Sequence, residues 1–390
     1  MSWPIPDIPD MFAPAHHKWN RPLIWLLALL LPYLLWLPML GLMWYRTTVE
    51  TVSALILLPL PLLVWSGVLL IVFIRSMHRE LAAKTWLQEK QNIHQRWVNW
   101  AQRSIAVIDS ASLLPEALDP SLGTTVLGQP LVFKRNEASF YPSFYQSTKI
   151  RQFYQQQLNS LLTRTKVKKL TIHITEPDWD GYQEWTELFE TALTDLGLAD
   201  TVEIELSKLF SDLNLLENWL ENHPSGLHVF VSTAFNDEPQ AAEFTENAVW
   251  IVLAAPDEVQ SKHLPLKALI HRPIDLLLSD EASAQVSLQQ FEEYGLPDKK
   301  INALWPAGLT QEAANALNAS LAESGILLKQ KGLVLHTPNQ YIGELPSNAA
   351  WLVLAMALEA DKQDAFLLAW EKEPHLCLMA YVQMAAVGNK

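Results

Sequence analysis

Two short segments, LHVFVST at residues 227–233 and VWIVLAA at residues 249–255, decide the fold class of this chain. Each is an almost unbroken apolar run rich in β-branched residues, which is typical of a strand that is covered on both faces. On either side of them, similar runs alternate with amphipathic helical patterns. The chain is therefore predicted to be an α/β protein whose largely parallel sheet is covered by helices on both faces.

The alternation extends outward from these two strands and falls into two similar sets. Further strands are expected at residues 169–175, 201–206, 267–274 and 332–337, with a β-hairpin at 365–382 whose turn lies near Glu373 and Pro374. Helices are expected at residues 142–165, 181–198, 211–222, 283–295, 310–324 and 347–363. The sets are similar in architecture but not residue for residue. They predict a first α/β half over 104–266 and a second over 267–390.

Before this region lie two long runs that carry no charged side chain, PLIWLLALLLPYLLWLPMLGLMW at 22–44 and a second run at 52–74. A bilayer core needs ~20 apolar residues in a helix, and a buried hairpin of a soluble core rarely has two runs of this length. No small-residue cleavage site follows the first run, which disfavours a signal peptide. The runs predict a two-helix transmembrane hairpin over 22–76, after a cytoplasmic segment at 1–21.

Basic residues gather at the outer ends of the predicted hairpin, whereas its connecting turn carries Arg46 against Glu50. Lys18 and Arg21 precede the first run, and Arg75, Arg79 and Lys84 follow the second. Basic residues favour the cytoplasmic ends of membrane spans. We therefore expect both termini in the cytoplasm, with the lipid bilayer as the partner of the hairpin.

A helical neck is predicted over 77–103. Trp86, Ile93, Trp97 and Trp100 recur at spacings of 7, 4 and 3, which places them on one helix face. We expect this stripe to pack on the body of the protein. The alternative is a lateral contact with the membrane or a partner, because Trp-rich basic helices also lie at interfaces.

Composition excludes several classes of function. The formal net charge is −14 and the pI is near 5.2, so nucleic acid is not an expected partner. A single cysteine, Cys377, excludes an internal disulfide and a cysteine-rich zinc site. Glycine-rich phosphate loops, nucleophile elbows and zinc-protease motifs are all absent from the sequence. No cofactor is therefore expected.

A few residues remain as candidates for chemistry. Cys377 could be a nucleophile with His271, His336 or His375 as its base. It lies, however, in the alternating strand LCLMAYV, where a buried cysteine behaves as a small apolar residue. His271 and His336 each follow an apolar run, where a hydrogen-bonded structural histidine is the commoner role, and no spacing suggests three metal ligands. No catalytic residue or metal site is therefore predicted. If the protein is an enzyme, His271, Arg272 and His336 are its candidate residues.

Three segments carry a resemblance to a known family: GLHVFVSTAFNDEP at 226–239, ALIHRPI at 268–274 and SNAAWLVLAMALEADKQDAFLLAW at 347–370. Together they resemble the type VI secretion lipase-adaptor family, whose soluble domain is thiolase-like. The resemblance covers approximately residues 104–384. It implies a duplicated thiolase-like fold, an inner-membrane location in a bacterium and a role in bringing an effector to the secretion machine. Thiolases place a cysteine nucleophile on an elbow in the first half, and this chain has none there, which argues against thiolase activity.

Three functions stay open. The first is a non-enzymatic adaptor or accessory protein, anchored in the inner membrane and linked to type VI secretion through effector handling or immunity, with a protein partner. The second is a membrane-tethered enzyme on a thiolase-like fold that acts on an acyl or lipid substrate. It would need a pocket with convergent polar groups at the carboxyl ends of the strands. The third is a structural subunit whose spans self-associate through the small residues Gly41, Ser66 and Gly67.

Overall fold

The computed structural model describes most of this 390-residue chain, with gaps. The described residues are Trp3, scattered residues between 34 and 45, and 59–114, 146–175, 182–209, 213, 215–222, 224–236, 244–296, 301–324, 333–345, 348–360 and 364–385. The chain divides into two compact units. We call Ile5–Trp97 the N-terminal unit, and Met1–Pro4 together with Val98–Lys390 the body.

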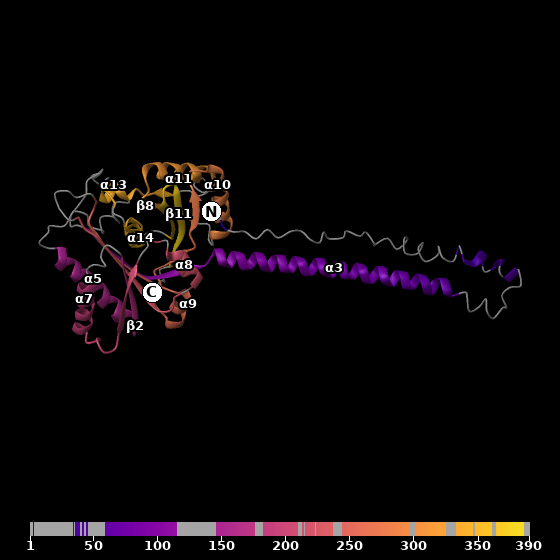
Figure 1. The fold of residues 1–390 in the computed structure, drawn as a ribbon, viewed down its shortest axis with the longest axis horizontal. Helices are drawn as coiled ribbons and strands as arrows, with labels where there is room; N and C mark the ends of the chain where they lie inside the picture. The colour runs from indigo at the N-terminus through magenta and orange to yellow at the C-terminus, as the bar shows by residue number, and fades with distance from the viewer. Residues whose placement is uncertain are drawn as a thin grey trace. The chain divides into compact units, whose positions relative to one another are not determined.

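Helix α3, Leu60–Ala101, is the main described element of the N-terminal unit (Figure 1). It begins next to Pro59 and has Pro61 in its first turn, where proline fits because the missing N–H has no intrahelical partner. The helix then runs on without a break through the predicted neck. The neck predicted over 77–103 is thus helical as far as Ala101.

The predicted membrane hairpin falls only partly on described residues. No helix in the described part of the chain is long and apolar enough to cross a membrane. The first predicted span, 22–44, is described only at scattered residues from 34 onward, and the second, 52–74, is described only from residue 59. The hairpin and its orientation stay predictions.

The strands of the body join in one sheet of eleven strands, in the order β3-β2-β4-β5-β1-β6-β11-β10-β8-β9, with β7 also paired to β11. The strands are β1 Ser104–Leu113, β2 Lys169–Thr175, β3 Glu203–Leu209, β4 Leu227–Ala234, β5 Asn247–Ala254, β6 Ala268–His271, β7 Ile274–Leu277, β8 Ala303–Ala307, β9 Val334–Leu335, β10 Ala365–Glu373 and β11 Leu376–Met384.

This sheet is mixed, and the prediction of a largely parallel sheet was wrong. Strands β4 and β5, the two segments on which that prediction rested, are antiparallel neighbours. Every residue of both strands is buried. A strand that is covered on both faces is continuously apolar whichever way its neighbour runs, so the sequence pattern reports burial and not direction.

The two halves of the sheet repeat one strand plan. In the first half, β2 lies between β3 and β4 and is parallel to both, and β4 pairs antiparallel with β5. In the second half, β8 lies between β9 and β10 and is parallel to both, and β10 pairs antiparallel with β11. The predicted hairpin at 365–382 is this last pair. The duplication expected from the sequence is thus visible in the topology, while the boundary near residue 267 stays a prediction.

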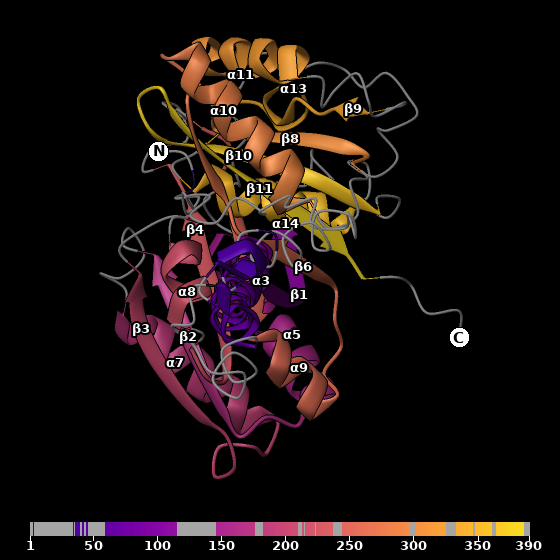
Figure 2. The same cartoon turned by 90° about the vertical axis from the view of Figure 1, so that its right-hand side faces the viewer.

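Helices cover the strands in three layers (Figures 1 and 2). The helices are α5 Gln146–Thr165, α7 Tyr182–Asp195, α8 Leu215–Asn222, α9 Pro256–Lys262, α10 Glu281–Gln290, α11 Gln311–Ser324, α13 Pro338–Ile342 and α14 Ala349–Glu359. Side chains of α5, α7 and α9 share one apolar core with the first half of the sheet. Side chains of α8 and α14 share a second core with strands of both halves. Helices α10 and α11 pack together, and α10 also packs on β7.

The sequence missed strand β8, and the reason is a proline. Pro306 lies inside β8, opposite Ala369 of β10. Proline cannot donate a hydrogen bond to a sheet, so its presence argues against a central strand. The neighbouring residues Leu304 and Trp305 are buried nevertheless, and their packing outweighs this local preference.

Candidate functional site

Arg272, one of the predicted candidates, lies in a junction where the end of the neck meets the body. Its guanidinium Nη2 is 2.8 Å from Oε1 of Glu221 on α8, and its Nε donates to the backbone oxygen of Trp100 at 3.1 Å. The guanidinium also lies 3.9 Å from the centre of the Trp100 ring, within the range of a cation–π contact. Arg272 therefore binds the last turn of α3 within the body and is committed to protein contacts.

Glu221 joins the other members of this junction. Its carboxylate accepts hydrogen bonds from Nε1 of Trp100 at 2.9 Å and from Nη1 of Arg103 at 3.1 Å. Partial burial raises the pKa of Glu221, but the hydrogen bond from Trp100 and the charges of Arg272 and Arg103 outweigh it and hold the pKa below its ordinary value. The carboxylate is thus kept ionised among two cations and an indole. We call Trp100, Arg103, Glu221 and Arg272 the neck junction.

His271 precedes Arg272 but faces a different environment. Its ring is buried, Nδ1 lies 3.2 Å from the backbone oxygen of Gln102, and the ring centre is 5.3 Å from that of Tyr381. Since a carbonyl oxygen can only accept, Nδ1 carries the proton in this contact. A histidine held in this way has the structural role that the sequence favoured.

His336 lies far from His271 in the sheet. It follows β9, whereas His271 ends β6, and β11, β10 and β8 lie between these strands. Four strand spacings correspond to about 19 Å along the sheet. The His336 ring stacks on Trp305 at 3.7 Å between centroids, and burial lowers the pKa of its imidazole to about 4. The structure therefore does not bring the candidate residues His271, Arg272 and His336 into one site.

Cys377 is sealed inside the sheet. Its side chain has no exposed surface, and burial raises the pKa of the thiol well above its ordinary value. A cysteine attacks as the thiolate, so this one has neither the charge nor the access that a nucleophile needs. The prediction that it is a small apolar residue of strand β11 agrees with this environment.

A pair of histidines on neighbouring parallel strands was missed from the sequence. Nε2 of His173 on β2 lies 3.0 Å from Nδ1 of His228 on β4, and Nε2 of His228 lies 3.1 Å from the backbone oxygen of Ser225. His228 must donate to that carbonyl, so its Nδ1 accepts from His173, and both rings are neutral. Burial, reinforced by the neighbouring His228, lowers the pKa of His173 to about 4.

Aromatic rings surround this histidine pair. Phe230 stacks on His173 at 4.8 Å between centroids, and Trp219 of α8 meets His228 edge-on at 4.5 Å. Phe230 stacks in turn on Trp351 of α14 at 4.7 Å. The pair is therefore part of an aromatic stack that links helix α8 to helix α14, which we call the two inner helices. The only hint in the sequence is one histidine in each of two strands, and it does not say that the strands are neighbours.

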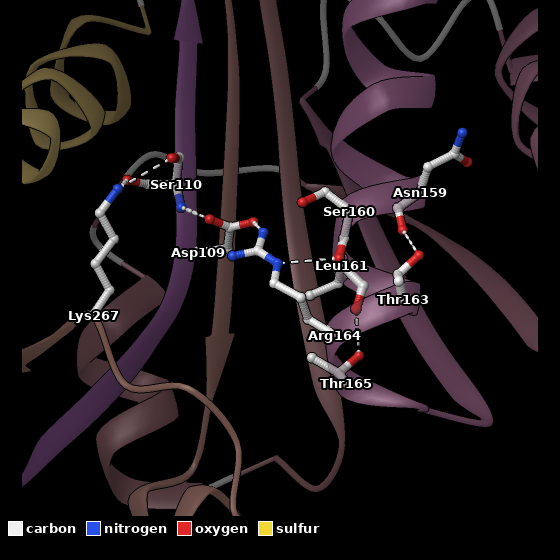
Figure 3. Close-up of polar contacts among 9 residues, drawn as sticks. All are labelled: Asp109, Ser110, Asn159, Ser160, Leu161, Thr163, Arg164, Thr165 and Lys267. Carbon is white, nitrogen blue, oxygen red and sulfur yellow. Dashed lines mark hydrogen bonds and ion pairs between the residues drawn. The ribbon is translucent and has the colours of Figure 1, made fainter. Parts of the chain in front are cut away.

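Strand β1 carries a polar line on both of its sides, at a β-bulge between Val107 and Asp109 (Figure 3). On one side, Nζ of Lys267 donates to Oγ of Ser110 at 2.7 Å and to the Ser110 backbone oxygen at 3.2 Å. On the other side, Arg164 of α5 pairs with the carboxylate of Asp109 at 2.5 Å. A serine beside a lysine amine is one known arrangement of a nucleophile and its base.

Glu359 extends this polar line from the end of α14. Its carboxylate accepts from the backbone N–H of Ser112 at 2.8 Å and from the Ser112 hydroxyl at 3.1 Å. Burial raises the pKa of Glu359, while Lys267 and Ser112 oppose that rise. Ser110 and Ser112 are themselves less than a tenth exposed. The cluster thus joins α14 and the segment before β6 to strand β1. Its candidate nucleophile, Ser110, is nearly closed to solvent.

The carboxyl end of β4 is where an enzyme of this architecture would need convergent polar groups. Such groups are present: Nδ2 of Asn348, just before α14, donates to Oγ of Ser232 at 2.9 Å and to Oδ1 of Asn247 at 3.0 Å. All three side chains are at least nine-tenths buried. They bond to one another and tie β4, β5 and the start of α14 together.

Metal binding has no described candidate. Within the described residues, no three His, Cys, Asp or Glu side chains are grouped so that they could hold an ion. The histidine pair alone offers two neutral nitrogens, and these are already engaged with each other.

Comparisons with known proteins gave similarity in structure only. No protein-family model matches the chain, and no curated protein matches it in sequence. Among solved structures, the chain is similar to a complex of a type II PKS acyl-carrier protein with its ketosynthase, at a TM-score of 0.47 and 10% identity, covering 73% of this chain and 100% of that one.

Two other similar structures are a thiolase and a synthase. The peroxisomal 3-ketoacyl-CoA thiolase of Saccharomyces cerevisiae has a TM-score of 0.45 and 8% identity, covering 73% of this chain and 98% of that one. The HMG-CoA synthase PksG of Bacillus subtilis has a TM-score of 0.42 and 12% identity, covering 73% and 80%.

These matches bear on the resemblance stated from the sequence. One of the three is a thiolase by name, and none of the three is named as a secretion adaptor. With TM-scores below 0.5, they carry no argument about the activity, substrate or partners of this chain.

Proposed function

We propose that this protein acts without chemistry of its own, as a membrane-associated adaptor whose α/β body binds a protein partner. One observation carries the proposal: the candidate groups are each engaged in structural contacts. Arg272 binds the last turn of α3, the His336 ring stacks on Trp305, and Cys377 is sealed within the sheet. Groups that perform catalysis must instead reach a substrate in the required protonation state.

The membrane part of the proposal rests on the apolar runs and on helix α3. Near the start of α3, Leu70, Ile71 and Phe73 are each more than half exposed. These successive residues point to different sides of the helix, so they do not form a single stripe for one neighbouring helix. Such a surface suits a lipid environment, and the basic residues that follow it suit the cytoplasmic side.

The finer form of the proposal concerns the partner. A component or effector of type VI secretion is supported only by the sequence resemblance over residues 104–384. The acidic composition of the chain is compatible with a basic docking surface on such a partner. An immunity role is the variant in which the partner is a toxin.

A quantitative pull-down from native cells tests the proposal. The full-length protein is extracted in detergent, and its companions are measured by mass spectrometry against an unrelated two-span membrane protein. The adaptor proposal expects one protein at near-equal amount, and recovery with a secretion component or toxin would support the finer form. Recovery of this chain alone, or only with copies of itself, would overturn the adaptor proposal.

The second candidate is an enzyme acting on an acyl or lipid substrate, and the contact between Ser110 and Lys267 favours it. In that case, Lys267, after losing its own proton, would take the proton of the Ser110 hydroxyl as Oγ bonds to an acyl carbon, and would pass that proton to the alcohol or thiol that leaves as its bond to the same carbon breaks. The serine is only 6% exposed, so the strand would have to open first. A fluorophosphonate probe distinguishes the two: labelling that is lost in Ser110→Ala supports the enzyme, and the adaptor proposal expects no labelling at Ser110.

A further inference from the structure

Trp3 is held inside the body although a unit of 93 residues separates it from the next part of the body. Its side chain is only 6% exposed, and its indole Nε1 donates to the backbone oxygen of Pro273 at 3.1 Å. Residues 1–4 thus belong to the body, and the chain leaves it after Pro4 and rejoins it at Val98. The burial and the hydrogen bond show that Trp3 occupies a defined site in the body.

The receiving site has three walls, which we call the Trp3 socket. The Trp100 ring meets Trp3 edge-on at 6.1 Å and 81°, and the Phe291 ring lies at 6.0 Å and 56°. Gly295 forms the third wall, because a Cβ on this residue would lie 2.7 Å from Cη2 of Trp3 and 2.9 Å from Cδ2 of Phe291. A side chain there would have to shift both rings, so the absence of one at Gly295 lets the indole pack against Phe291.

The walls of the socket are fixed by contacts that do not involve Trp3. Trp100 is held by its hydrogen bond to Glu221 and by the Arg272 guanidinium over its ring. Phe291 is fully buried where α10 passes into a short π-helical turn, Phe291–Gly295. The carbonyl that accepts from Trp3 belongs to Pro273, next to Arg272 of the neck junction. The socket can therefore exist without its occupant.

We propose that the Trp3 socket is a tryptophan-binding site of the body and that Trp3 is its resting ligand, docked in cis. The ligand class is an extended peptide with a tryptophan whose N–H meets the Pro273 carbonyl. In the intact chain, this docking holds the first residues of the body against Trp100, which follows the Ile5–Trp97 unit in sequence. The inference goes beyond the adaptor function and does not depend on it.

Peptide binding to the full-length protein tests the proposal. The Trp3→Ala variant in detergent is titrated against a labelled peptide of residues 1–10, MSWPIPDIPD, and followed by fluorescence anisotropy. The variant should bind saturably, and the wild-type protein should bind at least tenfold more weakly because its socket is occupied. A peptide with alanine in place of the tryptophan should not bind. Trp44→Ala, which removes a tryptophan that is 60% exposed, is the matched control and should behave as wild type.

A second variant keeps the test specific to the socket. Gly295→Ala in the Trp3→Ala background should abolish peptide binding, because the added methyl would lie 2.7 Å from Cη2 of a docked ring. The methyl would also press on Phe291, so circular dichroism and denaturant titration against Trp3→Ala check that the double variant stays folded. A folded Trp3→Ala protein that does not bind the peptide would overturn the proposal. So would equal binding of the alanine peptide, or a Trp3→Ala protein that fails to fold, since Trp3 would then be an ordinary core residue.

Discussion

The two halves of the sheet follow the same strand plan, yet the inner helices α14 and α8 differ in how much of their surface is buried. Helix α14 in the second half, AAWLVLAMALE, buries nine of its residues. Helix α8 in the first half, LLENWLEN, buries only Leu216 and Leu220 and keeps two glutamates on its outer side. One inner helix is core, and the other has a polar face that binds the rest of the molecule.

The polar face of α8 is where distant parts of the body are attached. Glu221 binds the end of the neck and Arg272, and Glu217 lies 3.5 Å from Lys372 of β10. A repeated topology thus fixes where helices lie but leaves each helix free to serve packing or attachment. The predictions below test this division of roles between α14 and α8.

The largest effect is expected when the tryptophans of the two inner helices are compared. Trp351→Ala in α14 removes a side chain that is 1% exposed and stacked on Phe230, and it should lower the free energy of unfolding by about 3–5 kcal/mol. Trp219→Ala in α8 removes a partly buried ring and should cost roughly 1–3 kcal/mol. Denaturant titration of both variants measures this difference. Equal costs would show that the two helices contribute alike.

Acid should weaken the first half through its histidine pair. The pKa of His173 is lowered to about 4 in the folded state, against 6.5 for the free group. As the pH falls below 6.5, His173 is protonated in the unfolded chain but stays neutral in the folded chain. The free energy of unfolding therefore falls between pH 6.5 and 4. For one such group the loss is of order 2–3 kcal/mol at most.

The His173→Phe variant isolates this contribution. Phenylalanine keeps a ring in the aromatic stack but cannot be protonated, so the fall in stability over that pH window should become shallower. His336, with a similarly lowered pKa, should still contribute its own part. Urea titrations of the wild-type and variant proteins at pH 7, 6 and 5 measure the slope, and an unchanged slope would contradict the assignment.

A smaller effect is expected at the neck junction. Glu221→Ala leaves Arg272 without its carboxylate and Trp100 without its acceptor, which should cost about 1–2 kcal/mol since the carboxylate is half exposed. Hydrogen exchange at residues 98–103 should rise in the same variant. The control is Glu217→Gln on the same helix, whose single ion pair to Lys372 is longer, at 3.5 Å, and should matter within about 0.5 kcal/mol. If both variants behave alike, the junction has no special role.

The smallest effect is expected at Cys377. Replacement by alanine removes one buried sulfur and should cost about 1 kcal/mol without loss of function. In the native wild-type protein, the thiol should resist iodoacetamide at pH 8, because burial raises its pKa and closes access. Rapid alkylation of the folded protein would contradict this account.

The sequence predicted the elements of this fold better than their assembly. Apolar runs and helical periods placed β2, β4, β5, α11 and the final hairpin, because burial is recorded locally in the residues. The direction of β4 and β5, the pairing of β2 with β4, and strand β8 with its proline depend on contacts between distant segments. The same reason applies to the candidate residues. The sequence shows that His271, Arg272 and His336 have side chains capable of chemistry. Their distances from one another and their contacts with other side chains depend on the tertiary structure.

The most direct test of the adaptor account is complementation by a chain that lacks the candidate nucleophiles. The Ser110→Ala, Cys377→Ala double variant is expressed from its own promoter in a strain deleted for this protein, and its fold is checked by circular dichroism after purification. The account predicts that the double variant corrects the defect of the deletion strain as fully as the wild-type protein does and still binds its partner. Loss of function in a folded, membrane-retained variant would contradict the account and favour the enzyme.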